Sequence, residues 1–200
     1  GVVSLNIPGL SPESTVQWTQ PQGLSTLLWT RSPLSQEEDF TKRRADCWLT
    51  LLSPEGEVLL QATLKSQRVI TGFGVDATLT PRGGMVFIEE TEQPNQSVVH
   101  CIDEMGQPLW KQSLNSSMPS FRLSLLEALP AGGYALWGYG SLEEGGMQPV
   151  VFRIDMDEQG KLRSVDVRQS DGLPVRYTGG QVYIKSRSFH APSLLPFDGL

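Results

Sequence analysis

A glycine motif recurs along the chain and constrains its fold more than any other feature. PQGLSTLLW begins at Pro21, PRGGMVFIE at Pro81 and PAGGYALWG at Pro130, and a weaker copy, YTGGQVYIK, begins at Tyr177. The first glycines of the copies are 60, 49 and 47 residues apart: Gly23, Gly83, Gly132 and Gly179. Self-similarity at such a spacing indicates a repeat architecture.

A second marker follows each of the first three copies. The segments CWLTLLSPEGEVLLQATL, SVVHCIDEMGQPLWKQSL and VFRIDMDEQGKLRSVDVR align without a gap on Gly56, Gly106 and Gly160. Each predicts a strand, a four-residue turn and a strand, because Ser or Asp opens the turn and Gly closes it at positive φ, as a type I turn requires. Two markers in the same order, three times over, indicate one repeated structural unit.

Each repeat predicts four short antiparallel strands. A strand follows the glycine pair, then come a variable loop and the hairpin, and a further strand leads to the next pair, as in TVQWTQP (15–21) and DATLTP (76–81). We interpret SFRLSLLEALP (120–130) as such an outer strand, although its leucine spacing also fits a helix. Four strands in about 45 to 50 residues describe a propeller blade, whereas a β-sandwich has no reason to repeat its turn chemistry in register.

We therefore expect an all-β, single-domain β-propeller over residues 1–200, with four-stranded antiparallel blades. The repeats are expected at about 15–66, 74–115 and 121–169, with a partial repeat at 173–188. Pairing of N-terminal strands into the last blade would close a ring of about four blades and remove its exposed edges. The alternative is half of a larger propeller, so both a monomer and a homodimer stay open.

The repeats resemble those of bacterial quinoprotein-like and related β-propellers. The resemblance lies in the Pro-x-Gly-Gly lead, the hydrophobic strand ending in Gly, and the hairpin, and it covers about residues 15–188; the best copies are GGYALWGYG and HCIDEMGQPLWKQSL. It implies an architecture and a location in the bacterial cell envelope or outside the cell, with the cytoplasm as the alternative. It carries over no catalytic or cofactor-binding motif. The chain opens GVVSLN without an initiator Met, which leaves a removed targeting segment open.

Composition argues against several classes of protein. The net charge of -6 argues against nucleic-acid binding, because no excess of Lys and Arg neutralises phosphates. The longest apolar runs are too short to span a bilayer. Cys47 and Cys101 predict buried thiols rather than a disulfide framework. No metal and no cofactor are expected, because His100 and His190 have no third ligand at a suitable spacing.

One alignment column supplies the candidate site. The strand after each glycine pair is expected to line the central channel, and its aligned residues include Trp29, Glu89 and Lys185, with Trp137 beside the aligned Gly138. A carboxylate, an ammonium and indoles in one register suit a ligand, so these four residues are the ligand-binding candidates. The alternative is an ion pair between Glu89 and Lys185 that only orients blades.

The function expected is that of a non-enzymatic binding or scaffold module. It would contact a protein or glycan partner through a loop face that includes residues 32–46 and 141–147, because no convergent acid–base set is visible and variation is concentrated in loops. The alternative is a hydrolase or lyase acting on saccharides at the channel mouth. The glycine pairs are not a phosphate cradle, because they precede strands rather than helices and they repeat.

Overall fold

A computed structural model describes residues 7–39, 42–68, 76–91, 93, 95–176, 182–186 and 194–197. The chain divides into two compact units, described separately below. Unit 1 comprises residues 1–73, 81–84 and 102–107, and unit 2 comprises residues 74–80, 85–101 and 108–200. No helix in the described part of the chain is long and apolar enough to cross a membrane.

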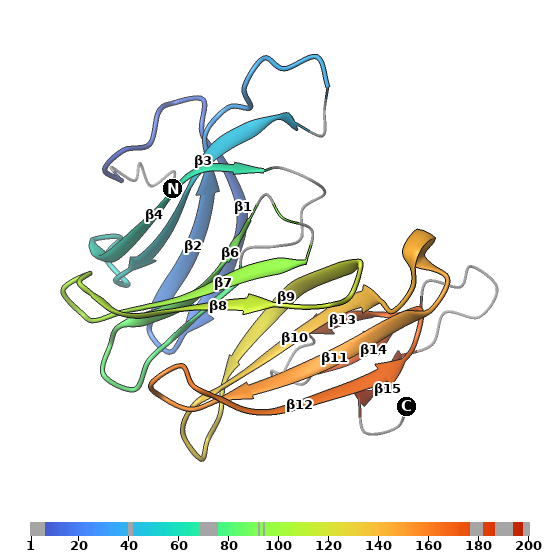
Figure 1. Cartoon of the computed structure of the whole chain (residues 1–200). Coiled ribbons are helices and arrows are strands. Elements are labelled where there is room, and N and C mark those ends of the chain that lie inside the picture. The colour runs from blue at the N-terminus through green and yellow to red at the C-terminus, as the bar shows by residue number, and fades with distance from the viewer. Residues whose placement is uncertain are drawn as a thin grey trace. The chain divides into compact units, whose positions relative to one another are not determined.

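The strands form four sheets, each in chain order (Figure 1). The first sheet contains β1 (Thr15–Gln22), β2 (Ser25–Arg31), β3 (Arg44–Leu52) and β4 (Val58–Arg68). The second contains β5 (Ala77–Leu79), β6 (Met85–Glu90), β7 (Gln96–Ile102) and β8 (Pro108–Asn115). The third contains β9 (Ser120–Ala128), β10 (Tyr134–Ser141), β11 (Pro149–Met156) and β12 (Leu162–Gln169). In its described residues the fourth contains β13 (Leu173–Arg176), β14 (Val182–Lys185) and β15 (Leu194–Pro196).

Antiparallel sheets built from consecutive strands and repeated along the chain are the blades of a β-propeller. The predicted all-β propeller fold with four-stranded blades is confirmed. The assignment of all 200 residues to one domain stays a prediction from the repeats.

The ambiguous segment 120–130 is a strand, as predicted. It forms β9, in which Ser124 is skipped in the pairing with β10: Trp137 pairs with Leu125 and Gly138 with Leu123. A bulge of this kind shifts the alternation of side chains by one residue. Phe121, Leu123 and Leu126 consequently share the core face at a spacing that imitates a helix.

The hairpin turns have the predicted geometry. Gly56, Gly106 and Gly160 have φ of 88°, 79° and 78°, and each donates its backbone N–H to the carbonyl of the residue that opens the turn, at 3.0 Å. In the third sheet the Asp157 carboxylate also accepts the N–H groups of Gln159 and Lys161, at 3.0 and 2.8 Å. The turn is thus specified by both of its end residues.

The glycine pairs are structural. The first glycine turns the chain at positive φ, as at Gly83 and Gly132, both at 86°. The second lies against the third strand of its own sheet, so a Cβ atom on Gly84 or Gly133 would be 2.2 Å from a backbone carbonyl oxygen. Gly133 combines a positive φ with this close approach of two backbones, and only glycine, which has no Cβ, allows both.

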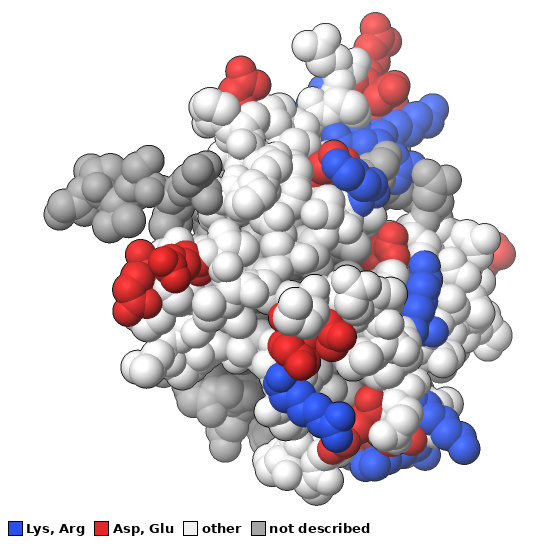
Figure 2. All heavy atoms as spheres, turned by 90° about the vertical axis from the view of Figure 1, so that its left-hand side faces the viewer, with Lys and Arg blue, Asp and Glu red and all other residues white. Residues whose placement is uncertain are grey.

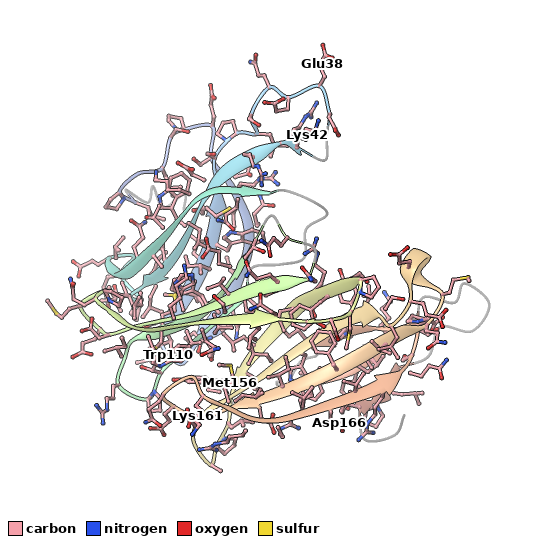
Figure 3. The ribbon with its side chains drawn as sticks, in the orientation of Figure 1. Glu38, Lys42, Trp110, Met156, Lys161 and Asp166 are labelled. Carbon is pink, nitrogen blue, oxygen red and sulfur yellow. The ribbon has the colours of Figure 1, made fainter. Side chains whose placement is uncertain are left out.

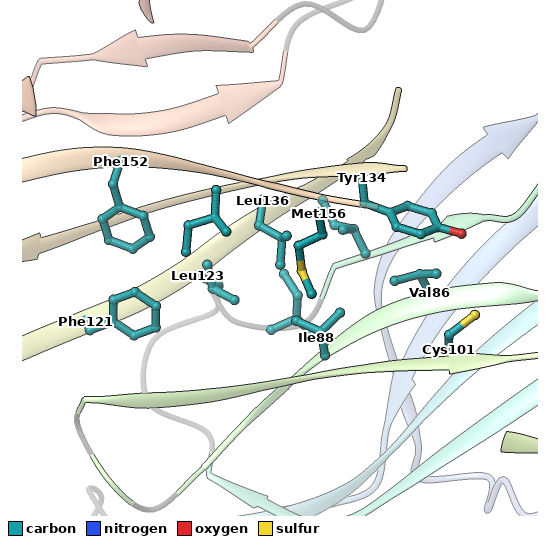
Figure 4. Close-up of a cluster of buried hydrophobic side chains, with 12 residues drawn as sticks. Val86, Ile88, Cys101, Phe121, Leu123, Tyr134, Leu136, Phe152 and Met156 are labelled. Carbon is teal, nitrogen blue, oxygen red and sulfur yellow. The ribbon is translucent and has the colours of Figure 1, made fainter. Parts of the chain in front are cut away.

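A hydrophobic cluster fills the space between the second and third sheets of unit 2 (Figure 4). Phe121 and Phe152 stack at 4.8 Å between ring centroids at one end of the cluster, and Val86 lies near Tyr134 and Cys101 at the other end, with Leu123 and Leu136 also among its members. In unit 1, Ile7 and Leu10 cover the face of the first sheet that carries Leu28 and Leu52. Cys47 and Cys101 are buried and not disulfide-bonded, as predicted. The remaining buried members of the cluster in unit 2 are Ile88, Val99, Cys101, Leu126, Tyr134, Ile154 and Met156.

Candidate functional site

The turn glycines of the hairpins give a common reference for comparing the sheets. Trp29 on β2 pairs with Leu49, the seventh residue before Gly56. On β10, Trp137 pairs with Arg153, the seventh residue before the corresponding turn glycine. Trp29 therefore corresponds to Trp137, and not to the glycine that follows Trp137.

The alignment column that supplied the candidate residues is thus not one structural register. Trp29 is the fifth residue after Leu24, the second position of its motif copy, whereas Trp137 is the fourth residue after Gly133. The first copy therefore contains one additional residue before the equivalent paired position. A shift of one residue turns a side chain to the opposite face of a sheet. In addition, β2, β6 and β10 are second in their sheets, with hydrogen-bonded strands on both sides, whereas the expectation of a channel-lining strand implied a sheet edge.

Trp137 is packed inside unit 2, with only 5% of its surface exposed. Its indole meets Phe197 edge-on at 5.0 Å, and the Arg153 guanidinium lies 5.1 Å from the indole centroid, a cation–π distance. Arg153 also pairs with Asp155 at 2.7 Å. The Trp137 Nε1–H has no hydrogen-bond partner among the described residues. These contacts join the third and fourth sheets.

Glu89 belongs to a polar cluster that sequence reasoning missed. Its Oε2 lies 2.5 Å from Nε2 of His100 and 4.0 Å from Nζ of Lys111, so the three side chains come from β6, β7 and β8. The His100 ring stacks on Phe87 at 5.0 Å with an interplanar angle of 8°. His100 had no partner visible in the sequence, because its neighbour across the strands depends on the sheet register.

Lys185 is exposed at the end of β14 and forms no ion pair in the described part of the chain, so the alternative ion pair with Glu89 is not present. Trp29 lies in unit 1 and the other three candidates in unit 2, where Glu89 and Trp137 have separate sets of neighbours. Ligand binding by the four residues stays a prediction. His190 lies outside the described residues.

A pocket of about 120 Å³ lies at the loop that joins β10 to β11. Its polar lining comes from Ser120 at the start of β9, from Tyr139 on β10, and from Ser170 and Asp171 after β12. The two adjoining strands approach closely at Gly140, where a Cβ atom would be 2.4 Å from the Ser120 carbonyl oxygen. The other lining residues are Gly140, Ser141, Gly146, Pro149, Val150 and Gly172.

The loop beside this pocket is held by its own hydrogen bonds. The Ser141 hydroxyl donates to the Glu143 carbonyl at 2.7 Å and accepts the Glu143 N–H at 3.3 Å. Gln148 closes the loop by donating to the Glu143 carboxylate at 2.5 Å. On the opposite wall, Ser170 Oγ accepts the N–H of Gly172 at 3.1 Å. The pocket is therefore bounded by ordered polar segments.

Unit 1 has a hollow at the equivalent loop, between β2 and β3. It measures about 350 Å³ and is lined by residues 34–38 and Arg43. Glu38 and Lys42 lie on this loop (Figure 3), where Lys42 pairs with Asp39 at 3.6 Å and Arg43 Nε donates to the Glu37 carbonyl at 2.9 Å. The loop thus holds a local ion pair and a hydrogen bond from Arg43 to the loop backbone.

The surface shows no concentration of one charge on the face drawn in Figure 2, where acidic and basic side chains lie intermixed among neutral ones. The described residues contain no group of three His, Cys, Asp or Glu side chains that would hold a metal ion. The pocket at the β10–β11 loop is the candidate site, because hydroxyl and carboxylate side chains line it together.

Neither a protein-family model nor a curated protein matches the sequence. Among solved structures, an ACO/RPE65 chimera is similar at 10% identity and a TM-score of 0.46, covering 84% of this chain and 42% of the other. Two Synechocystis apocarotenoid oxygenase (ACO) mutants, with a glutamate replaced by aspartate or by glutamine, are similar at 11% identity and 0.46, covering 86% and 88% of this chain. The chain spans less than half the length of these structures, at 42% and 45% for the two mutants.

Proposed function

We propose that the protein is a non-enzymatic β-propeller module that binds a protein or glycan through the loops between the second and third strands of its sheets. One observation carries the proposal: in each unit, taken separately, a hollow lies at this loop. The hairpin turns repeat their residues, whereas these loops differ in length and composition. Constant turns maintain a scaffold, and variable loops on a rigid scaffold commonly carry function.

The size of the unit 2 pocket supports a macromolecular partner. Pockets that enclose a whole small ligand measure roughly 300–1,000 Å³, and this one is about 120 Å³. It therefore suits one group projecting from a larger molecule. The alternative, a hydrolase acting on saccharides, works in most families with two carboxylates flanking the scissile bond, and the lining contributes Asp171. The proposed setting is the cell envelope or the exterior, in line with the quinoprotein-like resemblance of the repeats.

Loop replacement tests the proposal. Residues 142–148 and residues 33–43 are each replaced by Asn-Gly, a two-residue hairpin turn, and the variants are screened on immobilised glycans and peptides with circular dichroism as the check of folding. We expect at least one replacement to abolish the binding seen with the parent chain. Glu104→Gln, in the β7–β8 turn, is the control and should bind normally.

Unchanged partner binding by both folded loop variants would overturn the proposal. Release of new reducing ends from a bound glycan would instead support the saccharide-active alternative. Neither outcome depends on knowing the partner in advance.

A further inference from the structure

We infer that the pocket beside residues 142–148 receives a neutral, hydroxyl-rich group, the terminal sugar of a glycan. The inference rests on the proposed function and names the ligand class of one of its loop sites.

The lining offers donors and acceptors together. The hydroxyls of Ser120, Tyr139 and Ser170 are of the kind that both donates and accepts, and the Asp171 carboxylate only accepts. Ser170 uses one lone pair for the N–H of Gly172 and keeps its own O–H for donation. A sugar hydroxyl needs both kinds of partner, so this set matches vicinal hydroxyls better than a ligand that only donates or only accepts.

The charge of the pocket disfavours anions. Asp171 is the lining side chain that carries a formal charge, and Glu143 and Glu144 lie on the adjoining loop. Phosphate, sulfate and carboxylate groups would be repelled by these carboxylates. Because Asp171 is exposed, solvent screens its charge, so this repulsion of anions and any attraction of cations are both modest.

Apolar surfaces complete the match. The Tyr139 ring and Pro149 supply apolar parts of the lining, and sugar rings present C–H groups that such surfaces cover. Among the lining glycines, Gly146 has no atom within 4 Å of an added Cβ, so open space lies beside it. A sugar ring on these surfaces would present its hydroxyls to the serines and Asp171.

The test is an NMR titration of ¹⁵N-labelled protein with the methyl glycosides of glucose, galactose, mannose and N-acetylglucosamine. Inorganic phosphate and Nα-acetyl-lysine amide are titrated as the anionic and cationic comparisons. We expect at least one glycoside, and neither comparison compound, to shift the backbone amides of residues 139–141 and 170–172.

Three variants locate the binding. Asp171→Asn should weaken glycoside binding by about fivefold, because the charged acceptor becomes a neutral amide oxygen that accepts a weaker hydrogen bond. Ser120→Trp fills the pocket and should abolish the shifts, and Ser120→Gln serves if the larger side chain prevents folding. Asp166→Asn is the matched control: it removes an exposed carboxylate on β12, outside the lining, and should leave the titration unchanged.

The inference fails if no glycoside shifts these amides, if phosphate or the lysine amide does so instead, or if the shifts survive both filling variants. In those cases the loop replacements still test the proposed function. A partner that is lost on loop replacement, without any glycoside effect, would mean that loop binding stands and the sugar assignment does not.

Discussion

Asp76 joins two sheets of unit 2 through one buried hydrogen bond. Its Oδ2 accepts the backbone N–H of Leu126 at 2.6 Å, next to the bulge of β9, and its carbonyl oxygen accepts the N–H of Ile88. Near a bulge a backbone N–H loses its regular partner in the sheet, and a buried N–H without a partner is costly. A side chain from another sheet therefore completes the hydrogen bonding of β9.

Asp76→Ala should lower the free energy of unfolding by about 1.5–3 kcal/mol, the range for a hydrogen bond to a charged group. Asp76→Asn retains an acceptor and should lose less. The measurement is urea denaturation, with Glu55→Gln in an exposed turn as the control, expected within about 0.5 kcal/mol of the parent chain. A loss for Asp76→Ala as small as that of the control would contradict this role.

Tyr134 gives the protein a specific sensitivity to alkaline pH. Burial, together with the smaller effects of the Cys101 and Glu158 charges, raises the pKa of its phenol from 10.0 to about 12. The folded chain then holds its proton more tightly than the unfolded chain. Stability from this group is complete below pH 10 and is lost as the pH rises from about 10 to 12.

The expected loss amounts to about 2–3 kcal/mol by pH 12, since one pKa unit is worth about 1.4 kcal/mol. Tyr134→Phe removes the ionisable group, so its free energy of unfolding should fall less steeply above pH 10. Denaturant unfolding of both proteins between pH 9 and 12 checks this. Parallel pH profiles of the free energy of unfolding for the two proteins would rule out Tyr134 as the source of the alkaline sensitivity.

Within the elements, the second glycine of the pair is where a side chain is least tolerated. Gly133 has φ of 89°, and a Cβ atom there would lie 2.2 Å from the Met156 carbonyl oxygen. Gly145 has a similar φ of 74° but no atom within 4 Å of an added Cβ. The two positions separate backbone strain from steric overlap.

Gly145→Ala should destabilise the chain by about 1–2 kcal/mol through the left-handed conformation alone. Gly133→Ala should cost roughly 2 kcal/mol more than that, because backbone atoms of β11 must move. Urea denaturation of the pair is the measurement. Equal losses would mean that the close approach of Gly133 is unimportant.

Neighbouring sheets are also joined by their last strands. Trp110 on β8 donates its Nε1–H to the Glu158 carbonyl at 2.9 Å and covers Gly160, where an added Cβ would be 2.6 Å from the indole. The residue at the same distance from the first turn glycine, Leu60, lies beside Gly106. In these two cases, one side chain of the last strand packs on the hairpin turn of the following sheet.

Trp110→Phe should cost about 1 kcal/mol, the usual net value of one hydrogen bond. Trp110→Ala should cost about 2–3 kcal/mol, below the range for a fully buried Trp because Trp110 is partly exposed. Chemical denaturation compares the two variants. Identical losses would assign the whole effect to the hydrogen bond and none to the ring.

At the scale of the whole molecule, the question is whether a second copy of the chain is needed to cover apolar sheet faces. The face of the first sheet that carries Leu28 and Leu52 is covered by Ile7 and Leu10 of the same unit. The face of the third sheet that carries Trp137 is covered by Ile184 and Phe197 of the same unit. In both cases residues of the same unit cover the apolar face, and only the first of these sheets is at an end of the array, where repeat proteins need such a cap.

We therefore expect a monomer at micromolar concentration in light scattering. Ile7→Asp, which places a charge under the covering segment, should expose the first sheet and shift the chain toward association or lower stability. A dimer of the parent chain, unaffected by dilution, would support the half-propeller alternative instead.

Sequence alone determined the fold class, the hairpin turns and the role of the glycine pairs, because each depends on local chemistry. A glycine at positive φ, an Asp that opens a turn and alternating apolar residues act within a few residues of themselves, and they recur in register. The same local patterns identified residues 120–130 as a strand through their position in the repeat.

Tertiary structure decided which side chains meet. One additional residue between Leu24 and Trp29 placed Trp29 in the register of Trp137 rather than in that of the aligned Gly138. The arrangement of β6, β7 and β8 brought Glu89 next to His100 and Lys111. The pocket beside residues 142–148 collects side chains from four separate segments, none of which carries a motif. Register and strand pairing are set by the packing of whole sheets, so a site that depends on them is absent from any local stretch of sequence.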